Sequence, residues 1–170
     1  MFINSDNLNK DYHADFCVIG SGVGGSTAVK ELVDNNKNVI LIEAGALNGN
    51  STTITASTSG QSFDMPLTRS IGLGGTTNLW GGGLTPLDEI DFESTDDFGF
   101  KRWPYSFNDL IPSYIKAAKL FGIPDLSFFK ADSLSSLRKS QLDHLPVNRN
   151  VIDNKLFQIP LPLFRFKPML

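Results

Sequence analysis

The sequence contains few of the residues that build disulfide frameworks and metal centres. Its 170 residues include one cysteine, Cys17, and two histidines, His13 and His144. A single cysteine cannot form an internal disulfide, and it cannot supply the repeated thiolates of a Cys-rich zinc site. We therefore expect neither a disulfide framework nor a metal site in this chain.

Clustered basic charge is also missing. The formal net charge is −3, and the basic residues form nothing longer than the pairs Lys101-Arg102 and Arg138-Lys139. Binding to nucleic acid phosphates needs clustered Lys and Arg, so we expect no nucleic acid partner. No apolar run approaches the ~20 residues of a membrane span, and the polar stretch 1–13 lacks the apolar core of a signal peptide. We expect a cytoplasmic protein as the default.

The remaining composition, 41% hydrophobic and 19% charged, is typical of a globular domain or of part of a larger protein. Residues 16–19 and 39–42 are short, continuous apolar runs, as expected for parallel strands covered on both faces. Between them, Ala28, Val29, Leu32 and Val33 recur at helical spacing. The sequence therefore predicts a βαβ unit of the α/β class, with an incomplete parallel sheet of Rossmann type.

The turn after the first predicted strand carries a glycine motif. Gly20, Gly22 and Gly25 match G-x-G-x-x-G, with a strand before, a helix after and Glu43 at the end of the second strand. The first glycine permits a tight turn, the second lets a pyrophosphate approach the main chain, and the third lets helix and strand pack closely. Glu43 is placed to accept hydrogen bonds from an adenosine ribose and would repel the 2′-phosphate of NADP. This motif predicts dinucleotide binding without separating FAD from NAD.

A second glycine-rich segment runs from Arg69 to Gly83, with Leu73, Leu79 and Trp80 set among its glycines. Glycine density lets a main chain lie against a ligand, and two threonines and an asparagine add polar groups. Further along, residues 107–121 have helical spacing, with Ser106 and Asp109 as a capping box and Gly122 as a stop. Pro112 is tolerated only near the first turn, so the start of this helix is the least certain boundary.

Together these segments resemble the glucose–methanol–choline (GMC) family of flavin-dependent oxidoreductases. Arg69, Leu73-Gly74-Gly75 and Thr76-Thr77 are similar to the family's flavin-lining pattern, and residues 103–123 are similar to its Trp-Pro-x-Ser helix. Trp80-Gly81-Gly82 is nearer to the sugar dehydrogenase and pyranose oxidase branch. The resemblance spans residues 15–123. The site that it implies, combined with the first motif, comprises Gly20, Ser21, Gly22, Gly24, Gly25, Glu43, Ala44, Arg69, Gly74, Gly75, Thr76, Thr77, Asn78, Trp80 and Gly81.

The resemblance implies an α/β protein that binds FAD and oxidises the CH–OH group of an alcohol or sugar by hydride transfer to the flavin. Some relatives carry a histidine for covalent flavin attachment where this chain has Leu79, so FAD is expected to be non-covalent. The family's catalytic histidine pair lies near its C-terminus, and no residue of this chain matches it. We expect an exposed His13 and a loop around His144, and a chain cut short of its catalytic end and inactive alone.

The expected organisation is a polar leader (1–13), the N-terminal part of an FAD-binding domain (14–125) and the start of a substrate-side or connecting segment (126–170). Two alternatives stay open. An NAD-linked Rossmann dehydrogenase would explain residues 14–43 but would not explain the glycine-rich segment 69–83. An inactive fragment or binding module is the other. Substrate, electron acceptor and oligomeric state are not predicted.

Overall fold

The computed structural model describes residues 2–8, 10–47, 59–60, 65–93, 101–130, 147–148, 151–152 and 154–161. Their contacts divide the chain into two compact units. The first contains the described residues up to Trp80, and the second contains those of Gly81–Phe164. The division predicted at residue 125 stays a prediction, and most of the predicted segment 126–170 lies outside the described residues.

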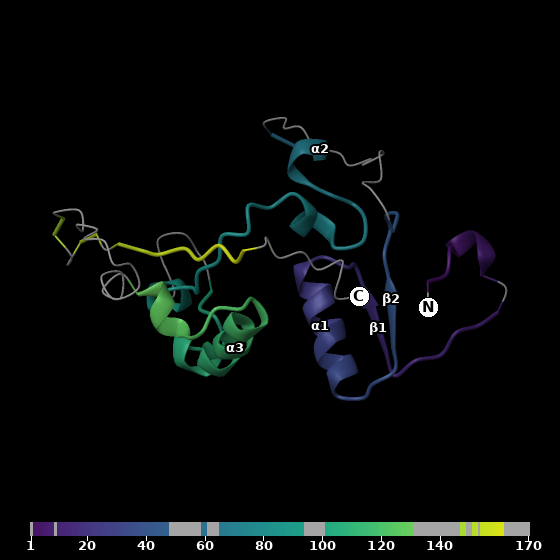
Figure 1. The fold of residues 1–170 in the computed structure, drawn as a ribbon, viewed down its shortest axis with the longest axis horizontal. Coiled ribbons are helices and arrows are strands. Elements are labelled where there is room, and N and C mark those ends of the chain that lie inside the picture. The colour runs from purple at the N-terminus through teal and green to yellow at the C-terminus, as the bar shows by residue number, and fades with distance from the viewer. Residues whose placement is uncertain are drawn as a thin grey trace. The chain divides into compact units, whose positions relative to one another are not determined.

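The first unit is built on the predicted βαβ element (Figure 1). Strand β1 (Phe16–Ile19) pairs in parallel with β2 (Val39–Ile42), so that Phe16 faces Val39 and Ile19 faces Ile42. Parallel strands need a crossover, and helix α1 (Val23–Asp34) supplies it. Both strands have the predicted bounds. The α/β class is confirmed, with a two-stranded parallel sheet.

Helix α1 ends where the sequence changes from helix formers to asparagine. Asn35 is its C-cap, and its N–H donates to the carbonyls of Glu31 and Leu32, both at 3.2 Å. Asn36 follows with φ +58°, a left-handed conformation that asparagine tolerates better than most residues. The helix therefore ends at Asp34, and the chain turns toward β2.

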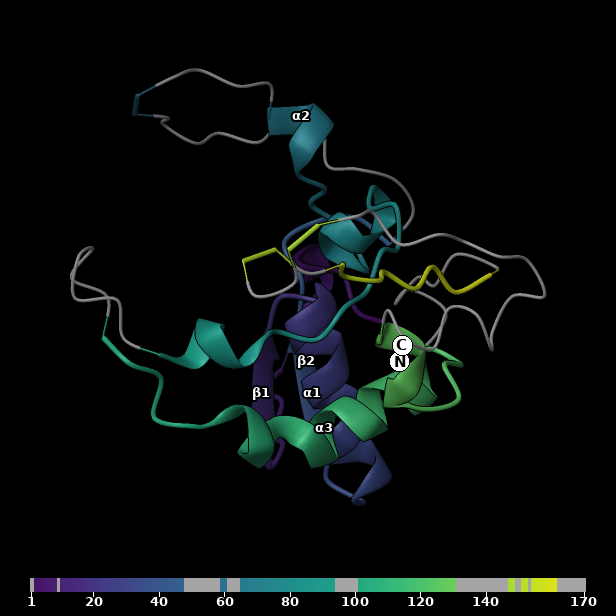
Figure 2. The same ribbon diagram turned by 90° about the vertical axis from the view of Figure 1, so that its left-hand side faces the viewer.

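Helix α1 packs against one face of the sheet, as Figure 2 shows with the helix in front of the strands. Val18 lies on this face, because its side chain is near Gly25 of the helix. Side chains alternate along a strand, so Ile19 and its partner Ile42 lie on the opposite face. They are 82% and 50% exposed. Burial on both faces was expected, and in the described part of the chain the second face is left largely open.

The second unit is held by aromatic packing around helix α3 (Phe107–Leu120). The predicted capping box is present: the Ser106 hydroxyl accepts from the N–H of Asp109 at 3.3 Å, and the Asp109 carboxylate accepts from the N–H of Ser106 at 2.8 Å. Phe92, at the end of the short 3-10 helix η3 (Glu89–Phe92), is 3% exposed. Its ring lies 6.1 Å from that of Trp103 and 6.3 Å from that of Phe107.

Four further short elements complete the described structure: η1 (Ser5–Asn7), α2 (Met65–Thr68), η2 (Gly75–Asn78) and η5 (Leu126–Phe129). Helix α3 continues through Pro112, which removes one main-chain donor, and Gly122 with φ +71° follows its end. Among the helices of the described residues, none has the length and apolar character needed to cross a membrane.

Candidate cofactor-binding site

Two of the three motif glycines are required by the chain's own geometry. Gly20 leaves β1 with φ +89°, which favours glycine, and its N–H donates to the carbonyl of Ile42 at 2.7 Å. A Cβ on Gly25 would lie 1.8 Å from the carbonyl oxygen of Gly20 and 3.4 Å from Cγ1 of Val18. The strand-to-helix turn and the close helix packing expected from the motif are therefore both present.

Gly22 differs from its neighbours. It is the N-cap of α1, with φ −65° and ψ −174°, an extended conformation open to any residue. A Cβ on Gly22 would meet no atom within 4 Å. Among the described residues, neither main-chain strain nor packing explains a glycine here. The position expected to face a pyrophosphate is thus the motif glycine with open space at its Cβ position.

The first turn of α1 presents main-chain donors. Gly22 makes no side-chain cap, and the turn that begins at Val23 contains no acidic residue. The first N–H groups of a helix have no partner within it, and the helix dipole adds partial positive charge there. Gly24, in the same turn, is exposed and has nothing within 4 Å of its Cβ position. This end of the helix can accommodate an anionic group.

Glu43 follows β2 directly and is tied to the glycine turn by hydrogen bonds. Its Oε2 accepts from the N–H of Ser21 at 2.8 Å and from the Ser21 hydroxyl at 2.5 Å. Its Oε1 accepts from the N–H of Gly45 at 3.0 Å. The carboxylate predicted to bind ribose therefore lies beside the turn predicted to bind pyrophosphate, held by the chain itself.

The surroundings of Glu43 favour its ionised form. Burial alone would raise the pKa of Glu43. Hydrogen bonds from the side chain and main chain of Ser21, and then from the N–H groups of Gly45 and Ala44, outweigh burial and hold the pKa below its ordinary value of 4.5. Glu43 is thus a charged acceptor at neutral pH, which suits hydroxyl donors and opposes a phosphate.

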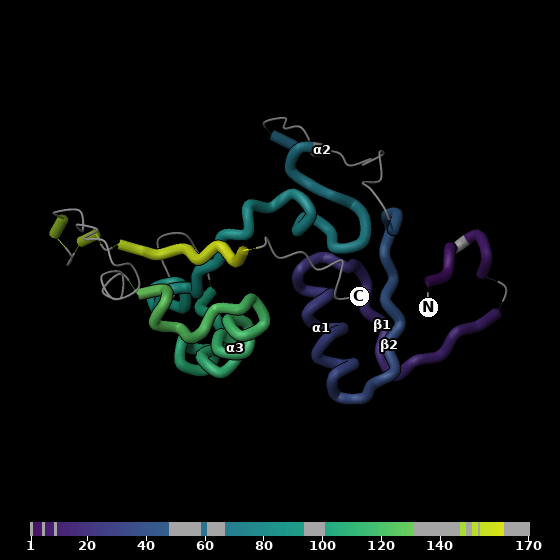
Figure 3. The backbone as a smooth tube through the Cα atoms, in the orientation of Figure 1, coloured from purple at the N-terminus to yellow at the C-terminus, as the bar shows by residue number. Residues whose placement is uncertain are grey.

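The second glycine segment folds back onto the first, and Figure 3 traces it from α2 to the N-terminal end of α1. A Cβ on Gly75 would lie 2.8 Å from Cα of Gly22. A Cβ on Gly45 would lie 2.4 Å from main-chain atoms of Ile71 and Gly72. The structure therefore brings together two glycine motifs that are about 50 residues apart in the sequence.

Polar side chains of the second segment bind its own main chain. Residues Gly75–Asn78 form the 3-10 helix η2. The hydroxyl of Thr77 donates to the carbonyl of Gly74 at 2.6 Å, and Nδ2 of Asn78 donates to the carbonyl of Leu73 at 3.0 Å. Thr76 accepts from a main-chain N–H of the same segment at 3.4 Å. In this structure they shape the loop, and ligand contact by these three residues stays a prediction.

For the remaining predicted residues, a role in the site stays a prediction. Ala44 is exposed, and Arg69 is exposed with Nη1 donating to the carbonyl of Thr68 at 3.1 Å. Trp80 is half-buried. Gly81 belongs to the second unit, so its place in the site stays a prediction.

Two residues outside the predicted set contribute to the site. Gly45 permits the close approach of the second segment to the end of β2. Ser26, fully buried in α1, donates from its hydroxyl to the carbonyl of Ser21 at 2.6 Å. The sequence carries a signal for Gly45, since a glycine follows Glu43 closely. It carries none for Ser26, whose burial depends on the approach of the glycine turn.

His13 does not join these residues. His13 is exposed, as expected, and its carbonyl accepts from Nδ2 of Asn38 at 3.4 Å. His144 lies outside the described residues. Within the residues that are described, no group of three or more His, Cys, Asp or Glu side chains is arranged to hold a metal ion.

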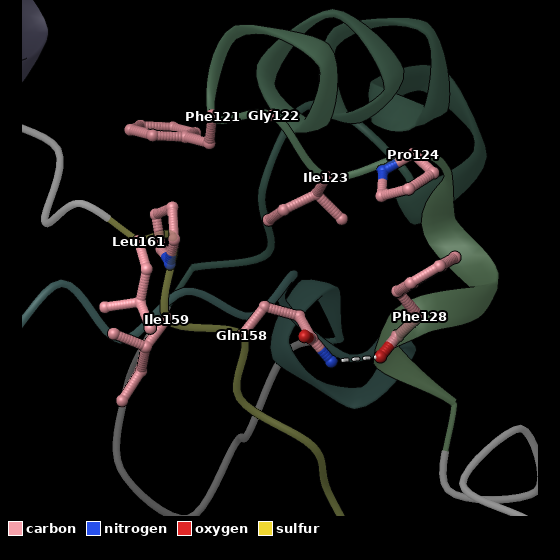
Figure 4. Close-up of a pocket in the computed structure, with 9 residues that line it drawn as sticks. Phe121, Gly122, Ile123, Pro124, Phe128, Gln158, Ile159 and Leu161 are labelled. Carbon is pink, nitrogen blue, oxygen red and sulfur yellow. Dashed lines mark hydrogen bonds between the residues drawn. The ribbon is translucent and has the colours of Figure 1, made fainter. Parts of the chain in front are cut away.

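The second unit has a pocket of its own, shown in Figure 4. Its volume is about 230 Å³, below the ~300 Å³ at which small-molecule sites begin. Gln158 places its side-chain amide in a hydrogen bond with the carbonyl of Phe128, and the remaining lining is mostly apolar. The pocket lacks convergent polar groups, so the glycine site of the first unit is the stronger candidate.

Comparison with known proteins gives one informative match. Over 126 aligned residues, the chain is 30% identical to 6'''-hydroxyparomomycin C oxidase of Streptomyces lividus. The alignment covers 64% of this chain and 23% of the relative, so the chain spans about a quarter of that oxidase's length. No family model matches the chain, and no solved structure matches it. The chain is therefore similar to part of an oxidase, in keeping with the predicted oxidoreductase class.

Proposed function

We propose that this chain forms the ADP-binding part of a flavin-dependent oxidoreductase that acts on CH–OH groups. FAD is the proposed cofactor, bound without a covalent link. The proposed substrate is a small alcohol or sugar, and the electron acceptor is not assigned. When bound, the flavin supplies the hydride acceptor; the residues described here supply binding and orientation.

The observation that carries the proposal is the contrast between Gly22 and Gly25. Gly25 is explained by packing, because a Cβ there would collide with the carbonyl of Gly20. Gly22 has ordinary main-chain angles and open space at its Cβ position. A glycine that no described residue requires would be accounted for by a ligand that approaches the main chain, and for this motif we propose a pyrophosphate.

The residues around Gly22 fit such a ligand. The uncapped first turn of α1 would hold the pyrophosphate through main-chain N–H groups. The ionised Glu43 would accept a hydrogen bond from the adenosine ribose. The segment from Arg69 to Gly81 would lie along the flavin half, as the GMC resemblance implies.

The oxidoreductase class rests on two supports. One is the resemblance of the Arg69–Gly83 segment and of residues 103–123 to GMC enzymes. The other is the similarity to a protein named as an oxidase of 6'''-hydroxyparomomycin C. Leu79, which has no nucleophilic nitrogen, stands at the position used for covalent attachment in some GMC members, so the flavin is proposed to be releasable.

The test is to replace Gly22 with Val in the intact protein, with Thr27→Val, exposed on the same helix and outside the predicted site, as the control. Gly22 has nothing within 4 Å of its Cβ position and Thr27 is exposed, so both variants should fold. Gly22→Val should lose at least 90% of the bound flavin, as read from flavin absorbance per polypeptide, because its side chain fills the space of the pyrophosphate (about tenfold weaker binding or more). Thr27→Val should retain it. Stoichiometric FAD in Gly22→Val would refute the site, and bound NAD in the wild type would favour the alternative dehydrogenase.

A further inference from the structure

Ser21 uses all of its polar groups within the protein. It is fully buried, at 0% exposure. Its N–H and its hydroxyl both donate to Oε2 of Glu43, its hydroxyl oxygen accepts from the N–H of Gly74 at 3.0 Å, and its carbonyl accepts from Ser26. One residue thereby joins the first glycine turn, the end of β2 and the second glycine segment.

These bonds restrict what Glu43 can offer a ligand. A carboxylate oxygen has two lone pairs, and both lone pairs of Oε2 are taken by Ser21. Oε1 accepts from the N–H of Gly45 at 3.0 Å, and the N–H of Ala44 contributes least to the lowered pKa of Glu43, so Oε1 keeps more capacity for another donor than Oε2. A ribose hydroxyl that approaches Glu43 must therefore be received by Oε1.

We propose that Ser21 is a positioning residue that orients Glu43 toward the adenosine ribose and anchors the Gly74 main chain, without touching the nucleotide itself. The inference rests on the proposed dinucleotide site and adds the residue that sets its ribose selectivity. The buried hydroxyl cannot reach a ligand, but it fixes which carboxylate oxygen is available. Short bonds to an ionised acceptor are the stronger kind of hydrogen bond, so this arrangement holds Glu43 in one orientation.

Removal of the hydroxyl has two local consequences. Oε2 of Glu43 loses the hydrogen bond from the Ser21 hydroxyl at 2.5 Å and keeps only the one from the N–H of Ser21. The carboxylate therefore gains rotational freedom. The N–H of Gly74 loses its acceptor at a buried position, which loosens the second segment where it meets the turn. We expect the first effect to change ribose recognition specifically, and the second to change all nucleotide binding alike.

The experiment compares ADP, 2′-deoxy-ADP and 3′-deoxy-ADP by isothermal titration calorimetry with the intact, flavin-free protein. In the wild type, at least one deoxy compound should bind about tenfold more weakly than ADP, because it lacks one hydrogen bond to an ionised acceptor. In Ser21→Ala the ratio of the affinity for ADP to the affinity for that deoxy compound should fall below about threefold. Thr27→Ala is the control: Thr27 is exposed on the same helix, its hydroxyl donates to the carbonyl of Val23 at 2.7 Å, and its removal should leave the ratio unchanged.

Three outcomes would overturn the inference. If Ser21→Ala weakens all three compounds by the same factor, Ser21 only supports the fold. If the wild type binds ADP without discriminating against either deoxy compound, Glu43 does not read the ribose. If the wild type binds none of them, the proposed dinucleotide site fails as well. If Ser21→Ala does not fold, Ser21→Cys replaces it, because cysteine has a similar volume and is a weaker donor. Its preference for ADP over the deoxy compound should be smaller than that of the wild type and Thr27→Ala, but should not be lost completely.

Discussion

Each of the two units is stabilised internally by a different kind of contact. In the first, main chains approach each other at distances that leave no room for a Cβ at Gly25, Gly45 or Gly75. Among its described residues, the fully buried side chains are the small, polar Ser21 and Ser26. In the second, the contacts come from large side chains: the ring of Phe92 lies 6.1 Å from Trp103 and 6.3 Å from Phe107, and Phe107 lies 5.7 Å from Tyr114.

This difference indicates what each unit tolerates. A unit built on close main-chain approach is sensitive to added atoms, because a carbonyl oxygen or a strand cannot move aside cheaply. A unit built on aromatic packing is sensitive to lost atoms, because a removed ring leaves a cavity.

The largest expected effect is that of one added methyl group in the first unit. Gly25→Ala places a carbon 1.8 Å from the carbonyl oxygen of Gly20, so α1 must move away from β1. The free energy of unfolding should fall by about 3 kcal/mol or more. Urea denaturation followed by circular dichroism measures this loss.

The neighbouring Gly24→Ala is the control for Gly25→Ala. It makes the same substitution in the same helix turn with nothing within 4 Å, and it should be neutral or should stabilise by up to about 1 kcal/mol. Equal stability of the two variants would show that the close approach of helix and strand does not exist in solution.

The next effect is the loss of a ring in the second unit. Phe92→Ala removes a side chain that is 3% exposed and contacts two other rings, and it should cost about 3 kcal/mol. Ile90→Ala, two residues away and 67% exposed, should change stability by less than about 0.5 kcal/mol. Denaturation monitored by tryptophan fluorescence, which reports on Trp103 of this unit and Trp80 of the first, distinguishes them. A Phe92→Ala variant as stable as Ile90→Ala would remove the contrast between the two units.

The smallest effect concerns acid stability. Because the pKa of Glu43 is lowered in the folded chain, the ionised carboxylate stabilises folding above its ordinary value of 4.5, and this contribution is lost as the pH falls through the lower folded value. Glu43→Gln should therefore flatten the decline in stability below about pH 4.5, by less than the loss expected from Phe92→Ala. Denaturation midpoints measured between neutral and acidic pH test this.

A comparison with Asp109 sharpens the acid prediction. Hydrogen bonds from the main chain and side chain of Ser106 lower the pKa of Asp109 too, but this carboxylate is exposed in the capping box of α3. Its contribution should be screened by salt, whereas that of the part-buried Glu43 should persist. If added salt removed both contributions equally, Glu43 would not be held in the protected setting that the structure shows.

Much of the local structure follows from the sequence alone. The apolar runs at 16–19 and 39–42 and the helical spacing between them predicted β1, α1 and β2, and the Ser106–Asp109 pair predicted the start of α3. These succeed because strand pattern, helix periodicity and capping depend on residues close together in the chain. Burial was less predictable: Ile19 and Ile42 were expected to be covered, and they are exposed because covering them depends on parts that are distant in sequence.

The sequence by itself determined which residues permit a nucleotide-binding turn: glycines at the required spacing, a helix behind them and Glu43 at the end of the next strand. Only the tertiary structure decided how these residues are used. It separated Gly25, needed for packing, from Gly22, left open, and it placed the hydroxyl of Ser21 between Glu43 and Gly74. The physical reason is that spacing along a chain specifies local geometry, whereas hydrogen bonds between residues 20 to 50 positions apart exist only once the main chains have met.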